Sequence, residues 1–208
     1  MTLSQVEDAA APHGLFVMGV DGSRVLLGTA SGWWSVFSET PEAQDGAPDP
    51  IDRWSKRVIG SLATAFGAKD SYPSDGPPYA PFIAWALATG RFWQSPTGMM
   101  IHDTAGLMIS IRGALVFPTA FPVAEAVPSP CETCAEQPCV TACPVDALSD
   151  QHAYDVPACK AYLAAPEGQA CMERGCAVRR ICPVSQAFAR PEAQSAFHMK
   201  AFLGCPAP

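Results

Sequence analysis

The sequence predicts an α+β fold with two parts, a mixed domain and a small cysteine-rich module. Two short apolar runs separated by Asp21–Gly22 predict a β-hairpin, and an amphipathic stretch at residues 50–66 predicts a long helix. All nine cysteines lie after residue 130. We expect a first domain at residues 1–128 and a second at residues 129–208.

The strands of the first domain are expected from short apolar runs. Residues 14–20 (GLFVMGV) and 24–28 (RVLLG) form the predicted hairpin, and residues 33–37 predict a third strand. Residues 99–102 and 107–117 predict two more strands joined by a short turn. The second of these is apolar almost throughout, which favours a central strand covered on both faces.

A long helix is predicted between Asp49, as N-cap, and Gly67, as its stop, with Pro50 in the first turn. Asp52 and Lys56 are spaced for an ion pair on its exposed side. Its buried face is expected to comprise Ile51, Trp54, Val58, Ile59, Leu62 and Phe66.

A second helix is expected at residues 78–89, followed by a proline-rich linker at residues 118–130. The buried stripe of that helix is predicted to be Tyr79, Phe82, Ile83 and Ala86.

Charge and hydropathy limit the classes of partner. A net charge of -7 over 208 residues opposes a broad phosphate-binding surface, so nucleic acid is not the expected partner. A local basic patch at Arg174, Arg179 and Arg180 is compatible with that charge. No basic residue precedes an apolar stretch at the start, and residues 107–117 are too short to cross a bilayer. We expect a soluble, cytoplasmic protein without a membrane partner.

The cysteines predict a metal site, because a reducing cytosol would not maintain disulfides. Eight of them form two sets, each ending in Cys-Pro. The sets are Cys131-x2-Cys134-x4-Cys139-x3-Cys143-Pro144 and Cys159, Cys171-x4-Cys176-x5-Cys182-Pro183. Zinc is an alternative, although only Cys131 and Cys134 make a paired knuckle. Cys205 belongs to neither set and is interpreted as an ordinary thiol.

Residues 142–148 (ACPVDAL) resemble the end of a bacterial ferredoxin motif, which implies two [4Fe–4S] clusters. In two-cluster ferredoxins the fourth cysteine of each set binds the other set's cluster. The resemblance therefore implies one cluster on Cys131, Cys134, Cys139 and Cys182, and a second on Cys159, Cys171, Cys176 and Cys143. The sequence departs from the family in two wider gaps, after Cys134 and before Cys182.

A wider resemblance is to epoxyqueuosine reductases, carried by both Cys-Pro endings and by Cys159-x2-Tyr162-Leu163. Those enzymes depend on cobalamin and [4Fe–4S] clusters, are related to corrinoid reductive dehalogenases, and have a nitroreductase-like first domain. Residues 14–120 are more similar to cobalamin-processing proteins, through Gly98-Met-Met-Ile101-His102-x3-Gly106-x4-Ile111-Arg112-Gly113. The resemblance implies a nitroreductase-like fold that holds cobalamin, or flavin mononucleotide (FMN).

Three residues have competing interpretations. His102 is the candidate cofactor-binding residue, and the alternative is a hydrogen-bonded structural histidine. Arg112 is expected to meet a cofactor phosphate or carboxylate, or to make a structural ion pair. Asp75 lies where epoxyqueuosine reductases have an acidic proton donor, or it is the N-cap of the following helix.

The expected function is delivery of low-potential electrons to a corrinoid bound by the first domain. No dinucleotide, phosphate-loop or zinc-protease motif is present in the sequence. We therefore expect a redox partner protein as electron donor. The alternatives are an epoxyqueuosine-reductase-like enzyme acting on tRNA and a ferredoxin-type electron carrier.

Overall fold

The computed structural model describes residues 1–122 and 127–204, and Cys205 lies outside these ranges. The chain divides into two compact units. The first comprises Met1–Phe92 and Ser110–Val127, and the second comprises Trp93–Ile109 and Pro128–Pro208. The sequence predicted a single boundary at residue 128. The structure differs, because Trp93–Ile109 belongs with the cysteine-rich unit.

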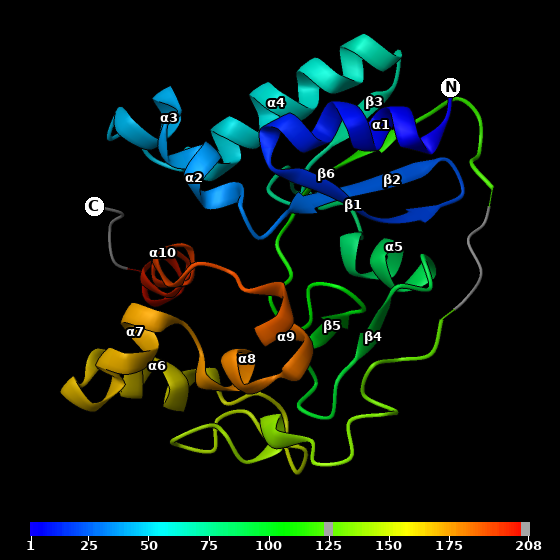
Figure 1. Cartoon of the computed structure of the whole chain (residues 1–208). Coiled ribbons are helices and arrows are strands. Elements are labelled where there is room, and N and C mark those ends of the chain that lie inside the picture. The colour runs from blue at the N-terminus through cyan, green and yellow to red at the C-terminus, as the bar shows by residue number, and fades with distance from the viewer. Residues whose placement is uncertain (123–126, 205–208) are drawn as a thin grey trace. The chain divides into compact units, whose positions relative to one another are not determined.

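The first unit contains a four-stranded antiparallel sheet in the order β1-β2-β6-β3 (Figure 1). The strands are β1 (Leu15–Asp21), β2 (Arg24–Thr29), β3 (Lys69–Ser71) and β6 (Ile111–Val116). The predicted hairpin and the central position of β6 are confirmed. Ala114 and Leu115 are both fully buried, and since consecutive side chains point to opposite faces, β6 is covered on both. β6 begins at Ile111, four residues later than predicted.

Six helical segments accompany this sheet: α1 (Leu3–Ala10), η1 (Ala11–His13), α2 (Trp33–Ser38), α3 (Pro41–Gln44), α4 (Pro50–Phe66) and α5 (Phe82–Ala88). The strand predicted at residues 33–37 is wrong, because this segment forms α2. Helical spacing puts Trp33 and Phe37 on one face, where their rings stack at 4.6 Å and meet Trp54 of α4. Aromatic packing therefore outweighs the local strand propensity.

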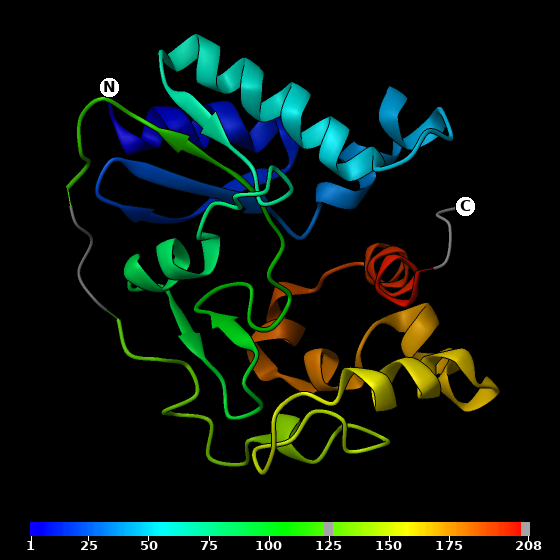
Figure 2. The same ribbon diagram turned by 180° about the vertical axis from the view of Figure 1, so that it is seen from behind.

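Helix α4 matches its prediction and packs against β6 and β3 (Figure 2). Gly67 ends it in the left-handed conformation, with φ of 62°, which glycine adopts without strain. Asp49 occupies the N-cap position but makes no side-chain capping bond. The predicted buried face is confirmed except at Phe66, which is half-buried.

Three expectations around α4 and α5 are wrong, wholly or in part. Lys56 pairs with Asp75, at 2.7 Å, in place of Asp52. Asp75 is not an N-cap, since α5 begins only at Phe82 and Pro81 takes that position. Of the predicted stripe, Phe82 and Ala86 are buried, whereas Tyr79 and Ile83 are exposed. Tyr79 precedes the helix, and Ile83 lies about 100° round the axis from Phe82.

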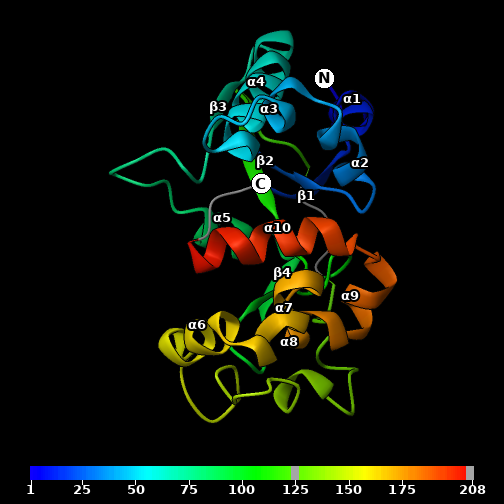
Figure 3. The ribbon, with the colours of Figure 1, turned by 90° about the vertical axis from the view of Figure 1, so that its left-hand side faces the viewer.

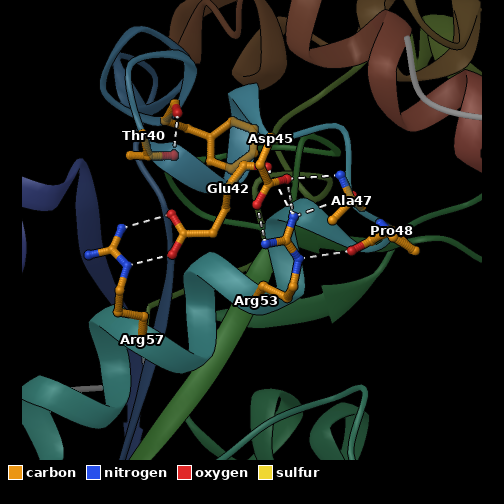
Figure 4. Close-up of polar contacts among 8 residues, drawn as sticks. Thr40, Glu42, Asp45, Ala47, Pro48, Arg53 and Arg57 are labelled. Carbon is orange, nitrogen blue, oxygen red and sulfur yellow. Dashed lines mark hydrogen bonds and ion pairs between the residues drawn. The ribbon is translucent and has the colours of Figure 1, made fainter.

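Two arginines of α4 hold the segment that contains α3 (Figure 4). Arg53 binds both carboxylate oxygens of Asp45 at 2.7 Å, and Arg57 binds both oxygens of Glu42. The Glu42 side chain is only 10% exposed. Its hydrogen bond to Arg57 lowers the pKa of Glu42, although burial opposes this effect.

The second unit has a two-stranded sheet of β4 (Phe92–Gln94, starting at the boundary residue) and β5 (Met100–His102). The remaining elements are η2 (Pro138–Val140), α6 (Val156–Ala164), η3 (Pro166–Gly168), α7 (Gln169–Arg174), α8 (Ala177–Ile181), α9 (Pro183–Phe188) and α10 (Glu192–Leu203). Helix α10 lies along α7 (Figure 3). Within the described ranges, no helix has the length and apolar character needed to cross a membrane.

Candidate metal centres

The four cysteines predicted to bind the first cluster line one cavity of the second unit. Its volume is about 230 Å³, and its wall includes Cys131, Cys134, Cys139 and Cys182. Cys139 lies in η2 and Cys182 lies between α8 and α9. Ile101 and Leu107, from the segment Trp93–Ile109, complete an apolar wall. The fourth cysteine thus comes from the other end of the module, as the crossed ferredoxin pattern requires.

The thiols of this group affect one another electrostatically. Burial raises the pKa of Cys139, and the neighbouring thiols of Cys131, Cys182 and Cys134 raise it further. Burial also raises the pKa of Cys131, where Cys182 and Cys134 add to the effect and Ser129 opposes it. Cys143, Cys159, Cys171 and Cys176 are not among the causes of these shifts.

Electrostatic effects also link the cysteines predicted to bind the second cluster. Burial raises the pKa of Cys159, as do the nearby thiols of Cys143 and Cys171. Burial raises the pKa of Cys176 as well, with a further contribution from Cys171. These effects link Cys159 to Cys143 and Cys171, and Cys176 to Cys171. They come from the segment after η2, from α6, from α7 and from the start of α8.

Helix α8 lies between two cysteines that the crossed pattern assigns to different clusters. Cys176 occupies its N-cap position and Cys182 its C-cap position. Five helical residues separate them, so their Cα atoms lie about 9 Å apart along the helix. On the η2 side, the chain passes from the first group at Cys139 to the second at Cys143. Since η2 and α8 pack together, they form a short bridge between the two groups.

Hydrogen bonds surround the sulfur atoms and order their backbone. The backbone N–H of Ala147 donates to Sγ of Cys143 at 3.2 Å. The N–H of Cys131 donates to Oγ of Ser129 at 3.3 Å. Tyr154 shares a hydrogen bond with Cys159, and burial together with this bond raises the pKa of the tyrosine. Sequence patterns did not identify Ser129 or Tyr154, because neither belongs to a cysteine motif.

The donor set and its cavity fit an iron–sulfur cluster. The eight described cysteines are all free of disulfides. Within the part of the chain that the structure describes, no three His, Cys, Asp or Glu side chains converge as ligands of a single metal ion. Four cysteine thiolates are the usual ligands of a [4Fe–4S] cluster, and the wall of the 230 Å³ cavity presents four cysteines.

The segment Trp93–Ile109 is tied to the cysteine module by polar contacts. The N–H of Leu107 donates to Oγ of Ser185 at 2.8 Å, and Arg179 donates to the carbonyl of Leu107. Gly106 has a φ of 57°, and a Cβ there would lie 2.4 Å from the backbone N of Ser185. Glycine is therefore required by both the backbone conformation and the close approach. Sequence spacing gave no sign of this contact.

His102 lies on β5, in the second unit rather than in the predicted corrinoid domain. It is fully buried, and its Nδ1 accepts hydrogen bonds from the N–H groups of Thr104 and Ala105, both at 3.1 Å. These bonds close the turn after β5, which accounts for a buried histidine at this position. His102 does not line the cavity of the first cysteine group.

Arg112 lies on β6 in the first unit, so the sequence stretch that carried the cobalamin resemblance is divided between the units. Its Nη1 is 3.6 Å from Oδ1 of Asp52. Desolvation lowers the pKa of Arg112, and the carboxylate of Asp52 opposes this shift. The ion-pair interpretation is thus the one that the contacts support.

Comparisons of the chain with family models, with curated proteins and with solved structures returned no match.

Proposed function

We propose that this protein is an iron–sulfur oxidoreductase that holds two [4Fe–4S] clusters and transfers electrons. One cluster is assigned to Cys131, Cys134, Cys139 and Cys182, and the other to Cys143, Cys159, Cys171 and Cys176. The observation that supports the proposal is the cavity lined by Cys131, Cys134, Cys139 and Cys182, whose fourth cysteine comes from the second sequence set. Electrostatic effects among the thiols of Cys143, Cys159, Cys171 and Cys176 agree with the second assignment. Such clusters supply one-electron transfer at low potential when bound.

The residues of the module have defined tasks in this proposal. The thiolates bind iron, and burial of Cys139 and Cys182 keeps water from the first group. Pro144 and Pro183 fix φ directly after a ligand and turn the chain away. The hydrogen bonds at Cys143 and Cys159 stabilise negative charge on sulfur, which is how protein surroundings adjust a cluster's potential. Since burial raises the thiol pKa values, cluster assembly must release protons.

Anaerobic preparation tests the stoichiometry and the ligand sets together. About eight iron and eight sulfide per chain are expected, with a broad visible absorption. Cys143→Ala should damage the electron paramagnetic resonance (EPR) signal of the cluster at Cys159, and Cys182→Ala that of the cluster at Cys139. Cys205→Ala, outside both sets, is the matched control and should leave both signals intact.

Two outcomes would contradict the proposal in different ways. Zinc in place of iron, without visible absorption, would remove the electron-transfer function. Damage by each substitution only to the cluster of its own sequence set would keep the clusters but reject the crossed assignment.

We also propose a corrinoid as the electron acceptor, on the strength of the sequence stretch around Ile101 and Ile111. Titration of cobalamin, and separately of FMN, into the intact protein tests this. Binding at tens of micromolar, followed by reduction of cob(II)alamin when the clusters are reduced, is expected. If neither cofactor binds, the protein is a ferredoxin-type electron carrier.

A further inference from the structure

A second cavity lies in the cysteine-rich unit, outside both thiol groups. Its volume is about 470 Å³, and residues of α7, α8, α9 and α10 line it. This volume is within the range of small-molecule sites, which run from about 300 to 1,000 Å³. The apolar part of its wall comes from Met108, Ala177 and Ile181.

Positive charge is concentrated in this cavity. Arg174, Arg180 and Arg190 line it, together with one acidic residue, Glu192. The second unit has six basic side chains in its sequence, Lys160, Arg174, Arg179, Arg180, Arg190 and Lys200, so half of them gather at one site. In a chain of net charge -7 this is a local reversal of the overall charge.

The guanidinium groups of the three arginines have different partners. Arg174 donates from Nε to Glu192 at 2.6 Å, and this ion pair offsets its charge. Arg190 donates from Nη2 to the carbonyl of Met108. Arg180 donates from Nε to the carbonyl of Gly175 at 2.9 Å and has no ion pair with any described residue. That bond orients the guanidinium and leaves its two terminal nitrogens for another acceptor.

We propose that this cavity binds a small molecule bearing a carboxylate or phosphate group, and that Arg180 holds that group. A guanidinium presents two parallel N–H donors that match the two oxygens of either anion. The apolar wall opposite would accommodate a short carbon skeleton. The half-buried position of Arg180 strengthens the pairing relative to one in open water.

Three residues of the cavity wall are close in sequence to cysteines of the two thiol groups. Ala142 precedes Cys143, Ala177 follows Cys176, and Ser185 lies three residues after Cys182, and all three line the cavity. A bound anion would therefore be held by the same short helices that hold the cysteines. The proposal goes beyond electron transfer and does not depend on it, since it rests on the arginines alone.

Isothermal titration of the intact, anaerobically prepared protein with inorganic phosphate and, separately, with succinate tests the proposal. At least one probe should bind with a Kd below about 1 mM. Binding of phosphate alone would identify a phosphate-bearing ligand, and binding of succinate alone a carboxylate. Arg180→Ala should weaken binding at least about tenfold, because the charged fork is lost.

Lys200→Ala is the matched control, because it removes one positive charge from the same unit at a residue outside the cavity wall. It should change affinity by less than about twofold, since salt screens a charge that does not contact the bound anion. Ala177→Glu places a carboxylate in the wall three residues before Arg180 and should abolish binding by pairing with it. Thermal unfolding of each variant verifies that it is folded.

Three results would overturn the proposal. They are the absence of binding for both probes up to about 10 mM, equal losses in Arg180→Ala and Lys200→Ala, and unchanged binding in Ala177→Glu. The Ala177→Glu measurement decides the question even if Arg180→Ala does not fold.

Discussion

The two units bury different kinds of side chain. Among the described residues, twelve large side chains are almost completely buried, and ten of them belong to the first unit, including Trp33, Phe37 and Trp54. The other two, Leu107 and His102, come from the segment Trp93–Ile109. The chain after residue 127 buries mainly small, polar and thiol side chains, such as Cys139, Cys171 and Ser185.

This difference indicates two sources of stability. The first unit has a continuous apolar core and a paired sheet, which are sufficient to fold a domain of its size. The cysteine-rich unit combines short helices with long irregular segments and few large apolar side chains. Small domains of that kind usually require metals or disulfides, so we expect its stability to come from iron.

The largest expected effect follows from removing iron. Chelation should lower the amide exchange protection of α8 and α9 at least about a hundredfold, equivalent to ~2.7 kcal/mol. Protection of β2 and β6 in the first unit should remain, because their burial does not involve a thiol. Hydrogen exchange with mass spectrometry before and after chelation measures both. Equal protection of α8 with and without iron would refute this account.

One core substitution in each unit should show that the stability of the first unit and the iron content of the second vary independently. Trp54→Ala removes an aromatic side chain that is 1% exposed and should cost about 3–5 kcal/mol of unfolding free energy, with iron content unchanged. Leu107→Ala, at a similarly buried residue of the second unit, should release iron faster because it opens the wall of the first thiol cavity. Denaturant unfolding and iron analysis on both variants test the pair. Iron loss in Trp54→Ala would show that the units do not act separately.

The smallest effect concerns Glu42 and Arg57 of the first unit. The folded-state pKa of Glu42 lies below its ordinary value of 4.5, so its stabilisation is present above that value and is lost as the pH falls through the lowered value. Glu42→Gln should cost about 1 kcal/mol at neutral pH and remove this acid-dependent loss. Thermal unfolding from pH 7 to pH 3 compares the two proteins. A steeper loss of thermal stability at acid pH in Glu42→Gln would show that the Glu42–Arg57 pair is not the source of the acid-dependent loss.

Local patterns predicted the hairpin, the central strand and the long helix of the first unit, and the four cysteines that line one cavity of the second. The Asp21–Gly22 turn and the Pro50–Gly67 helix carry their signals within a few residues. Trp33 and Phe37 were misassigned because their partner, Trp54, lies far along the chain. Ser185, Tyr154 and the cavity at Arg180 depend on contacts between short helices, and no spacing rule describes those.

The position of Trp93–Ile109 in the chain has a consequence for synthesis on the ribosome. This segment emerges before β6, which completes the first unit's sheet, and long before Ser185 and Arg190, which bind Leu107 and Met108. At 5–20 residues per second the interval is on the order of 10 s. During that time the first unit can fold around a loop whose apolar side chains have no partner. Nascent chains are therefore expected to engage chaperones at this loop, and iron supply late in translation would determine how soon they are released.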